Sequence, residues 1–330
     1  MAIVFHERYL DHVQYEGHPE SPERLAVPIK RMLEFDVWRD VTRPEAATEE
    51  DLQLAHTPRH IAWIKNSPEG FLDPDTYIHK ETFEIALLAA GGTIEAARIA
   101  YDHHEPALAL VRPPGHHAGR DFCGGFCYFN NIAIAARKMG LERTVIVDID
   151  VHHGNGTEDI FIEDDKVLFI STHQRGIYPG TGAAENVGKG KGEGFNINIP
   201  LRGGIGDATY MVVFDRIVEP VLRQFDPQMI LVSIGVDAHY ADPLASLALS
   251  SKAYLELCSR LISVAPEKRI AFVLEGGYAL EATAEVLSAL VGHFSGVEIP
   301  MQQIYSKDVE GSGKEELETI IEIQNKYWDL

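Results

Sequence analysis

Residues 145–156 read Val-Ile-Val-Asp-Ile-Asp-Val-His-His-Gly-Asn-Gly. The first part, 145–151, is apolar and β-branched apart from two aspartates, which predicts a buried strand. Side chains alternate between the faces of a strand, so Asp148, Asp150 and His152 are expected on one face at its carboxyl end. Two carboxylates and an imidazole beside an apolar strand are costly unless a cation neutralises them. Capping of a neighbouring loop would explain one Asp, but Asp-x-Asp-x-His-His-Gly indicates a metal site.

Strand-like and helix-like segments alternate along most of the remaining chain. Strands are predicted at 3–5, 107–111, 167–171, 229–235 and 269–274, and helices at 48–66, 82–101, 130–139, 207–225, 250–264, 280–294 and 315–327. Loops are predicted at 17–25, where Ser21 is the expected helix N-cap, at 67–79 and at 173–194, with a hinge at 311–313. This alternation is typical of a parallel sheet covered by helices on both faces. No linker or repeat divides the chain, so residues 1–330 are predicted to form a single domain.

Four chemically rich segments follow predicted strands directly. They are 112–119, 148–155, 237–239 and 275–278. In open parallel sheets, ligands bind outside the carboxyl ends of the strands. The four segments are therefore expected to meet in one site.

The composition limits the classes of partner. The chain has 330 residues, of which 45% are hydrophobic and 24% charged, and a formal net charge of −21. Such a charge argues against nucleic-acid binding, and would attract cationic peptides or amines, although solubility alone also explains it. Three Cys argue against a disulfide framework and for a reducing compartment. With neither a signal core nor a membrane span in the sequence, the protein is expected to be soluble and cytoplasmic.

The residue types in the four segments suggest metal-assisted amide hydrolysis. Asp150, His152 and Asp237 supply three ligands and leave positions open, as catalytic rather than structural metal sites do. Such a metal polarises a carbonyl and lowers the pKa of its bound water. The His116–His117 pair offers a base for that water and an acid for a leaving amine. Tyr278, on a Gly-Gly turn, can donate a hydrogen bond to a developing oxyanion.

Three other features have weaker interpretations. For His153, support of the metal ligands and a structural role are equally favoured. For His239, a place at the mouth of the pocket and a place on the surface are equally favoured. Cys123 and Cys127 form a Cys-x-x-x-Cys pair, but the sequence has no second pair to complete a zinc site.

The chain resembles the histone deacetylase superfamily, which includes the acetylpolyamine amidohydrolases. The matching motifs occur in the family's order: His-Pro-Glu-Ser-Pro-Glu-Arg-Leu at 18–25, Arg-Pro-Pro-Gly-His-His-Ala at 112–118, Gly-Gly-Phe-Cys-Tyr-Phe-Asn-Asn at 124–131, Asp-Ile-Asp-Val-His-His-Gly-Asn-Gly at 148–156, Tyr-Pro-Gly-Thr-Gly at 178–182, Gly-Val-Asp-Ala at 235–238 and Glu-Gly-Gly-Tyr at 275–278. The resemblance implies the three-layer α/β arginase/deacetylase fold, with an eight-stranded parallel sheet between helical layers.

The resemblance also implies roles for the site residues. Asp150, His152 and Asp237 correspond to the zinc ligands, although the same ligands suit ferrous iron. His116 and His117 correspond to the tandem histidines, with His117 favoured as the proton shuttle. Three further positions carry catalytic support in the family: Asp148 pairs with the first histidine, Asn155 stands where class II members have Asn and class I members have Asp, and Tyr278 stabilises the oxyanion.

Substrate and potassium sites follow from the same resemblance. Phe126 and Tyr178 correspond to aromatic walls of an acyl-lysine tunnel, and Gly125 is expected to offer its carbonyl to the substrate amide. One potassium ion would use Asp148, Asp150, His152, Ser171 and Thr172, and a second would use Phe161, Asp164, Val167 and Phe195.

The substrate indicated is acetyl-lysine or acyl-lysine in proteins or peptides. Leu244 follows Asp242-Pro243 where the polyamine-selective eukaryotic branch has a glutamate, so acetylpolyamines remain the second candidate. A ureohydrolase lacks support because its two-metal motifs are missing. A non-catalytic acyl-lysine reader is disfavoured by the full set His116, His117 and Tyr278. The sequence does not fix the acyl length, the physiological substrate or the oligomeric state.

Overall fold

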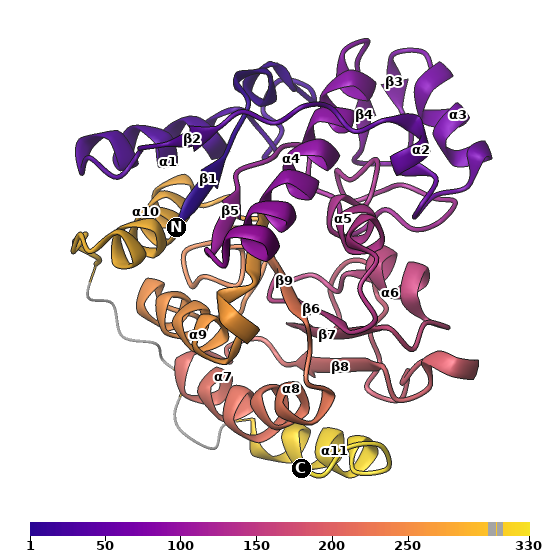
Figure 1. The fold of residues 1–330 in the computed structure, drawn as a ribbon, viewed down its shortest axis with the longest axis vertical. Helices are drawn as coiled ribbons and strands as arrows, with labels where there is room; N and C mark the ends of the chain where they lie inside the picture. The colour runs from indigo at the N-terminus through magenta and orange to yellow at the C-terminus, as the bar shows by residue number, and fades with distance from the viewer. Residues whose placement is uncertain (303–307, 309–312) are drawn as a thin grey trace.

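An eight-stranded parallel sheet forms the centre of the computed structural model, which describes residues 1–302, 308 and 313–330 (Figure 1). Along the sheet the strands follow the order β2 (Val41–Thr42), β1 (Ala2–Val4), β5 (Ala107–Ala109), β10 (Ile270–Leu274), β9 (Met229–Ile234), β6 (Thr144–Asp148), β7 (Val167–Gln174) and β8 (Asn196–Leu201). All neighbouring pairs are parallel. The predicted fold class, a parallel sheet flanked by helices, is confirmed.

Helices pack against the sheet and against one another. The α-helices are α1 (Glu23–Glu34), α2 (Glu49–Leu52), α3 (Pro58–Asn66), α4 (Thr82–His103), α5 (Asn131–Met139), α6 (Asn155–Phe161), α7 (Asp207–Val213), α8 (Glu219–Phe225), α9 (Ser251–Val264), α10 (Leu280–Ser295) and α11 (Lys314–Gln324), and the short helical turns are η1 (Glu7–Asp11), η2 (Gly190–Gly192), η3 (Phe214–Val218) and η4 (Pro266–Lys268). Helices α4 and α5 lie together over β1, β5, β9 and β10, while α1, α10, α9 and α7 pack side by side in a second row (Figure 1).

The central strands are buried along their whole length. Every residue of β6, β7, β9 and β10 is buried. Parallel strands covered on both faces read as continuous apolar runs rather than as alternating patterns. Polar side chains therefore begin where these strands end, and that edge of the sheet carries the site.

The central strand is shorter than predicted, because side chains bind the backbone N–H groups that follow it. Asp148 Oδ1 accepts the N–H of Asp150 at 3.1 Å, and Asp150 Oδ1 accepts that of His152 at 2.8 Å. Asp237 Oδ1 accepts the N–H of Val151 at 2.9 Å. Such local bonds compete with the strand ladder. The prediction that Asp148, Asp150 and His152 share one strand face is therefore wrong, since the last two lie in a turn beyond β6.

The predicted helix at 48–66 is two helices, α2 and α3. Thr48 and Thr57 each accept a backbone N–H at a helix start. Thr57 precedes Pro58 and is extended, with ψ of 151°. A residue before proline avoids the helical region, so the predicted helix is interrupted at Thr57.

Other boundaries also differ from the prediction. The loop at 67–79 contains a small antiparallel pair, β3 (Gly70–Phe71) and β4 (Tyr77–Ile78). β7 extends into the loop predicted at 173–194, and β8 was not predicted at all. Ser21 is not the N-cap of α1, because Pro22 occupies that position without a side-chain cap. Most of the hinge predicted at 311–313 lies outside the described residues.

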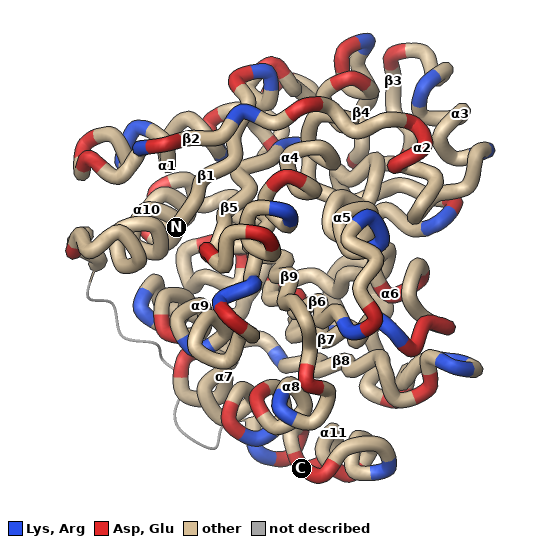
Figure 2. Tube along the Cα trace, in the orientation of Figure 1, with Lys and Arg blue, Asp and Glu red and all other residues tan. Residues whose placement is uncertain are grey.

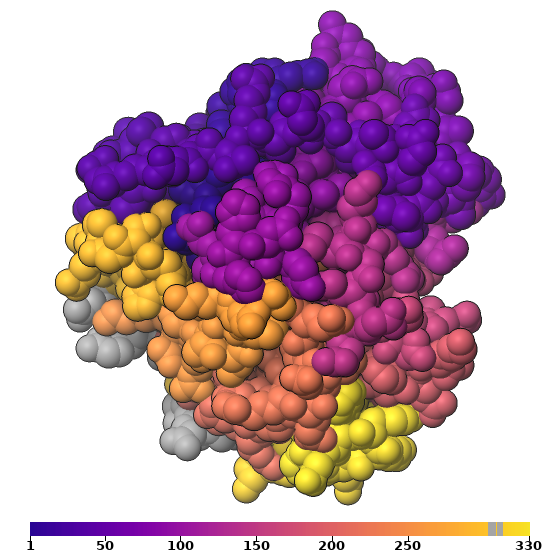
Figure 3. Space-filling view, in the orientation of Figure 1, coloured from indigo at the N-terminus to yellow at the C-terminus, as the bar shows by residue number. Residues whose placement is uncertain are grey.

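The C-terminal helix covers the edge of the sheet. α11 packs against β8, and Arg216 of η3 pairs with Glu318 of α11 at 2.6 Å. In Figure 3 these C-terminal residues, in yellow, lie against the segment that carries α7 and α8. Covering an edge strand blocks its unpaired backbone groups from pairing with another chain.

Charged residues of both signs lie along the outer helices and loops (Figure 2). Within the part of the chain that the structure describes, no helix combines the length and the apolar character that a membrane crossing needs.

Candidate active site

Three side chains that the sequence assigned to a metal meet at the carboxyl ends of β6 and β9. One donor atom from each of Asp150, His152 and Asp237 lies within 4.8 Å of the other two. His152 Nδ1 is 3.1 Å from Asp150 Oδ1 and 3.2 Å from Asp237 Oδ2. The two carboxylates are fully buried. The structure thus brings the three residues together, so that two carboxylate oxygens and one imidazole nitrogen could bind the same ion.

The chemistry of this group fits a divalent cation. Asp237 Oδ2 is buried, and His152 Nδ1, 3.2 Å away, is its ion-pair partner among the described residues. Burial opposes the charging of His152, but the carboxylates of Asp150 and Asp237 outweigh burial and raise its pKa to about 10. Burial, followed by the charge of Asp150, raises the pKa of Asp237 to about 7. Two buried carboxylates that compete for one positive charge favour a metal ion between them.

Glycine at two positions makes room for the carboxylates. A Cβ at Gly276 would lie 2.1 Å from Asp237 Oδ2, and one at Gly235 would lie 2.0 Å from Asp150 Oδ2. The N–H of Gly276 also donates to Asp150 Oδ2 at 2.8 Å. Glycine is therefore required at Gly235 and Gly276 by the close approach of the metal carboxylates.

The tandem histidines lie beside the metal residues, after β5. His116 Nδ1 is 3.0 Å from Asp148 Oδ2, and His117 Nδ1 is 2.7 Å from Asn155 Oδ1. The centres of the two rings are 4.0 Å apart. Because the amide oxygen of Asn155 only accepts, Nδ1 of His117 carries the proton of that bond and Nε2 is left as a base.

Different neighbours give the two histidines different charges. Burial disfavours the imidazolium of both, but Asp150 and Asp148 outweigh burial at His116 and raise its pKa well above the usual value. At His117, burial and then the positive charge of His116 lower the pKa well below the usual value. His117 is therefore neutral and able to accept a proton.

Glu275 positions the tandem-histidine segment, a role that the sequence analysis missed. Its Oε2 accepts the N–H groups of Gly115 at 2.7 Å and of His116 at 3.1 Å, and its Oε1 accepts the hydroxyl of Ser233 at 3.2 Å. The only sequence signal is a carboxylate directly after an apolar strand, where an unpaired charge would be costly.

Tyr278 packs against Phe126 and Arg24. Its ring centre is 5.8 Å from that of Phe126, and the guanidinium carbon of Arg24 is 4.9 Å from the Tyr278 ring centre. Arg24 donates to the carbonyls of Gly277, at 2.8 Å, and of Glu275. Burial raises the pKa of the Tyr278 phenol well above its usual value, so the hydroxyl keeps its proton. Arg24 belongs to a motif matched in the sequence, but its role was not predicted.

Tyr178 packs against His117, and Gly125 lies close to both. The ring centres of Tyr178 and His117 are 4.9 Å apart. A Cβ at Gly125 would lie 2.4 Å from His117 Cδ2 and 2.9 Å from Tyr178 Cε1, so only glycine fits there. Phe126 has a φ of 69°, a left-handed conformation rare for an aromatic residue. Leu244 is exposed on the surface, as is Tyr178.

The first predicted potassium set is adjacent to the metal residues. Asp148 pairs with Ser171 in the register of β6 and β7, and Thr172 Oγ1 donates to the carbonyl of Asp148 at 3.3 Å. In the second set, the N–H of Asp164 donates to the carbonyl of Phe161 at 2.9 Å, and the Asp164 carboxylate pairs with Arg137. The other two members, Val167 and Phe195, lie in β7 and directly before β8.

His153 and His239 have structural contacts. His153 Nδ1 is 2.8 Å from Thr181 Oγ1, and its Nε2 is 3.2 Å from Glu158 Oε2. His239 is buried and lies 3.2 Å from Ser251 Oγ, so a surface role for His239 is wrong.

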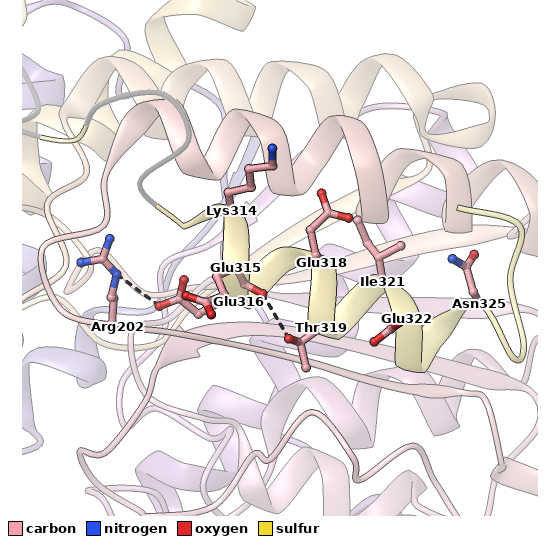
Figure 4. A pocket seen from close by; sticks show the side chains of 9 residues that line it. All are labelled: Arg202, Lys314, Glu315, Glu316, Glu318, Thr319, Ile321, Glu322 and Asn325. Atoms are coloured by element: carbon pink, nitrogen blue, oxygen red, sulfur yellow. Dashed lines mark hydrogen bonds and ion pairs between the residues drawn. The ribbon is translucent and has the colours of Figure 1, made fainter.

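The cavity drawn in Figure 4, of about 830 Å³, lies elsewhere along α11. Its lining residues come from α11 and from Arg202, which pairs with Glu316 at 3.2 Å. None of the candidate catalytic residues lines it. This cavity is therefore separate from the cluster of Asp150, His152 and Asp237.

Comparisons with known proteins show the family of this chain. A family model described as histone deacetylase domain matches residues 18–294. A probable deacetylase of Archaeoglobus fulgidus is 41% identical over 352 residues, covering 99% of this chain and 98% of the relative. Histone deacetylase 14, chloroplastic, of Arabidopsis thaliana is 42% identical over 316 residues, covering 85% of this chain and 74% of the relative.

A solved structure, the crystal structure of the HDA15 HD domain, shares the fold with a TM-score of 0.91 and 32% identity, covering 99% of this chain and 94% of that chain. The matched domain and the deacetylase-named relatives support a hydrolytic deacetylase. The chain belongs to the histone deacetylase family.

Proposed function

We propose that this chain is a metal-dependent deacetylase that hydrolyses the side-chain amide of acetyl-lysine, or of another acyl-lysine, in proteins and peptides. One observation carries the proposal. The three metal residues, a neutral His117 and the Tyr278 loop meet at one end of the sheet. Each has a role in amide hydrolysis, and together they form the set that the reaction needs.

The roles of the residues follow from their contacts. A bound ion would polarise the amide carbonyl and lower the pKa of a water. His117 Nε2 takes a proton from the water that attacks the carbonyl carbon, and a histidine proton then goes to the leaving amine as the C–N bond breaks. The Tyr278 hydroxyl donates to the carbonyl oxygen as negative charge develops. Asn155 holds the His117 ring in the required tautomer.

The approach favours an extended alkyl chain. We place the alkyl chain of the substrate between Phe126 and Tyr178, beside Gly125, where a Cβ would collide with both His117 and Tyr178. A lysine stem fits between aromatic faces of this kind. Exposed Leu244 offers no carboxylate to a second ammonium, so acetylpolyamines are the weaker candidate.

The oxygen and nitrogen groups near the site indicate which ions the protein would bind. The two oxygens and one nitrogen suit Zn²⁺ or Fe²⁺. Backbone and side-chain oxygens around Asp148, Ser171 and Thr172 suit K⁺, as do those near Phe161 and Asp164. We assign residues 1–330 to one catalytic domain. The three free Cys suit a reducing compartment such as the cytoplasm.

A substrate panel tests the function. The metal-loaded protein is assayed on an acetyl-lysine peptide, longer acyl-lysine peptides, acetylspermidine and acetylputrescine, and the kcat/KM values are compared. The acetyl-lysine or an acyl-lysine peptide should be the best substrate. A preference for the polyamines of about tenfold or more, about 1.4 kcal/mol of transition-state discrimination, would contradict the substrate assignment.

A matched pair of variants sharpens the test. Leu244→Glu adds a carboxylate beside the site and should raise kcat/KM for acetylspermidine relative to the peptide. Leu54→Glu makes the same change at a leucine of similar exposure, 41% against 40% for Leu244. Equal effects of the two variants would mean that Leu244 does not face the substrate.

A further inference from the structure

Asp242 joins two segments that both border the site. Its carboxylate is buried, with 6% of the residue exposed. Oδ2 accepts the N–H of Tyr278 at 2.7 Å and the N–H of Ala279 at 3.0 Å. Oδ1 accepts the N–H of Leu244 at 3.0 Å. One carboxylate therefore holds the backbone of the proposed oxyanion donor and that of Leu244, whose side chain is exposed.

We propose that Asp242 is a positioning residue that fixes Tyr278 for its role in amide hydrolysis. The same carboxylate fixes the backbone of Leu244 relative to Tyr278. The inference rests on the proposed function. It differs from the assigned roles, because Asp242 itself touches neither the substrate nor the metal residues in this proposal. It acts through the backbone of Tyr278.

The local conformation explains why an anchor is needed. Tyr278 follows Gly276 and Gly277, and Gly277 has a φ of 123°. Glycines in such conformations leave the following residue with many accessible orientations. Helix α10 begins just after, and its N-cap, Ala279, has no side chain that could cap the helix. A carboxylate that accepts two successive N–H groups at a helix start removes that freedom and is favoured by the helix dipole.

Arg24 holds the same loop from its carbonyl side. It binds the carbonyls of Glu275 and Gly277, while Asp242 binds the N–H groups of Tyr278 and Ala279. The Arg24 guanidinium thus fixes the carbonyl groups of this loop, and the Asp242 carboxylate fixes its N–H groups. Only a small shift of the phenol is tolerated, because a displacement of about 1 Å costs on the order of a hundredfold in rate.

A double-mutant cycle with Tyr278→Phe tests the inference. Asp242→Ala removes all three bonds and should lower kcat on an acetyl-lysine peptide by about ten- to a hundredfold, with little change in KM and unchanged metal content. In the Tyr278→Phe background, the same change should lower kcat by less than about threefold, because the hydroxyl that Asp242 positions is already absent. Losses that multiply would overturn the inference while leaving the deacetylase proposal intact.

Two further variants complete the design. Asp242→Asn keeps one acceptor oxygen for the Tyr278 and Ala279 N–H groups and should recover part of kcat. It replaces Asp242→Ala in the double-mutant cycle if Asp242→Ala does not fold.

Asp51→Ala removes a buried carboxylate that accepts the N–H of Thr48 at 2.9 Å, far along the chain from Tyr278. It should reduce the free energy of unfolding without changing kcat. An Asp242→Asn variant as slow as Asp242→Ala, or a kcat loss in Asp51→Ala equal to that in Asp242→Ala, contradicts positioning. A parent protein that hydrolyses no acyl-lysine would remove the proposed function and this inference together.

Discussion

His116 and His117 are neighbours in the chain but differ in charge because of the residues that face them. Asp148 lies 3.0 Å from His116, whereas the neutral amide of Asn155 lies 2.7 Å from His117. Asp150 and Asp148 raise the pKa of His116, whereas burial and the positive charge of His116 lower the pKa of His117. The pair is thus divided into a charged member and a neutral base, and we propose the neutral His117 as the proton shuttle.

The hydroxyl of Tyr278 can be removed without changing the rest of the side chain. Tyr278→Phe keeps the ring and its contact with Phe126 but removes the donor to the oxyanion. We expect kcat on an acetyl-lysine peptide to fall on the order of a hundred- to a thousandfold, with KM little changed, because the bond strengthens only in the transition state. Metal content should stay the same. Hydrolysis by the variant within threefold of the parent rate would reduce Tyr278 to a packing role.

Residue types and spacing predicted the metal group and the tandem histidines, because carboxylates and imidazoles at strand ends are costly without a ligand. The same reasoning could not find the residues that support them. Glu275 binds Gly115 across 160 positions, and Asp242 binds Tyr278 across 36. A single carboxylate in the sequence carries no sign of such distant partners.

The turn after β6 is the element on which the metal group depends. The sequence predicted a strand through residue 151, since apolar β-branched residues continue to that point. Bonds from Asp148, Asp150 and Asp237 to backbone N–H groups end the strand at Asp148 instead. The polar side chains that form the site are also those that shape its backbone.

β8 shows a second limit of sequence reasoning. Asn196–Leu201 contains two Asn and Pro200, which weaken any strand pattern. The strand lies at the sheet edge, where a proline is tolerated. Its asparagines point to a partner in another element, the carboxylate of Glu158 in α6.

The carboxylate of Glu158 connects α6 with β8 and with two loops. Glu158 accepts the side-chain amides of Asn186 at 2.5 Å, Asn196 at 2.8 Å and Asn198 at 2.6 Å, and pairs with His153 at 3.2 Å. Glu158→Ala leaves buried donors unpaired and should lower the free energy of unfolding by about 3 kcal/mol. Denaturant unfolding measures this loss.

The control for Glu158 is a glutamate on the surface. Glu256→Ala removes an exposed carboxylate paired with Arg260, and should cost less than about 1 kcal/mol. If the two variants unfold with the same midpoint, the Glu158 network contributes nothing beyond a surface pair.

Buried neutral histidines make the stability of the whole molecule sensitive to acid. Burial lowers the pKa values of His12, His56 and His173 to about 3. His56 uses both ring nitrogens as a neutral ring, 2.8 Å from the Gly119 carbonyl and accepting the N–H of Asn130 at 2.9 Å. In the unfolded chain a histidine has a pKa near 6.5. Between about pH 6.5 and 3 the unfolded state therefore binds more protons, so stability is full above that range and falls as pH decreases.

A comparison of the parent with His56→Gln isolates one such contribution. The stabilising effect of His56 should be greatest near pH 7 and shrink by up to about 1.4 kcal/mol per pH unit as the medium is acidified from pH 6.5 toward pH 4. Urea unfolding at pH 7, 6 and 5 gives the difference directly. A difference that is the same at all three pH values would show that His56 titrates alike in both states.

In the function proposed above, one metal ion, held by Asp150, His152 and Asp237, makes this chain a deacetylase. The most direct measurement is the rate of acetyl-lysine peptide hydrolysis against the amount of Zn²⁺ or Fe²⁺ returned to metal-stripped protein, with bound metal determined by elemental analysis. We predict no hydrolysis without metal, a linear rise to a plateau at one ion per chain, and neither tight binding nor activity in Asp237→Ala. Full hydrolysis by the stripped protein, or one bound ion per chain and parental activity in Asp237→Ala, would contradict the claim.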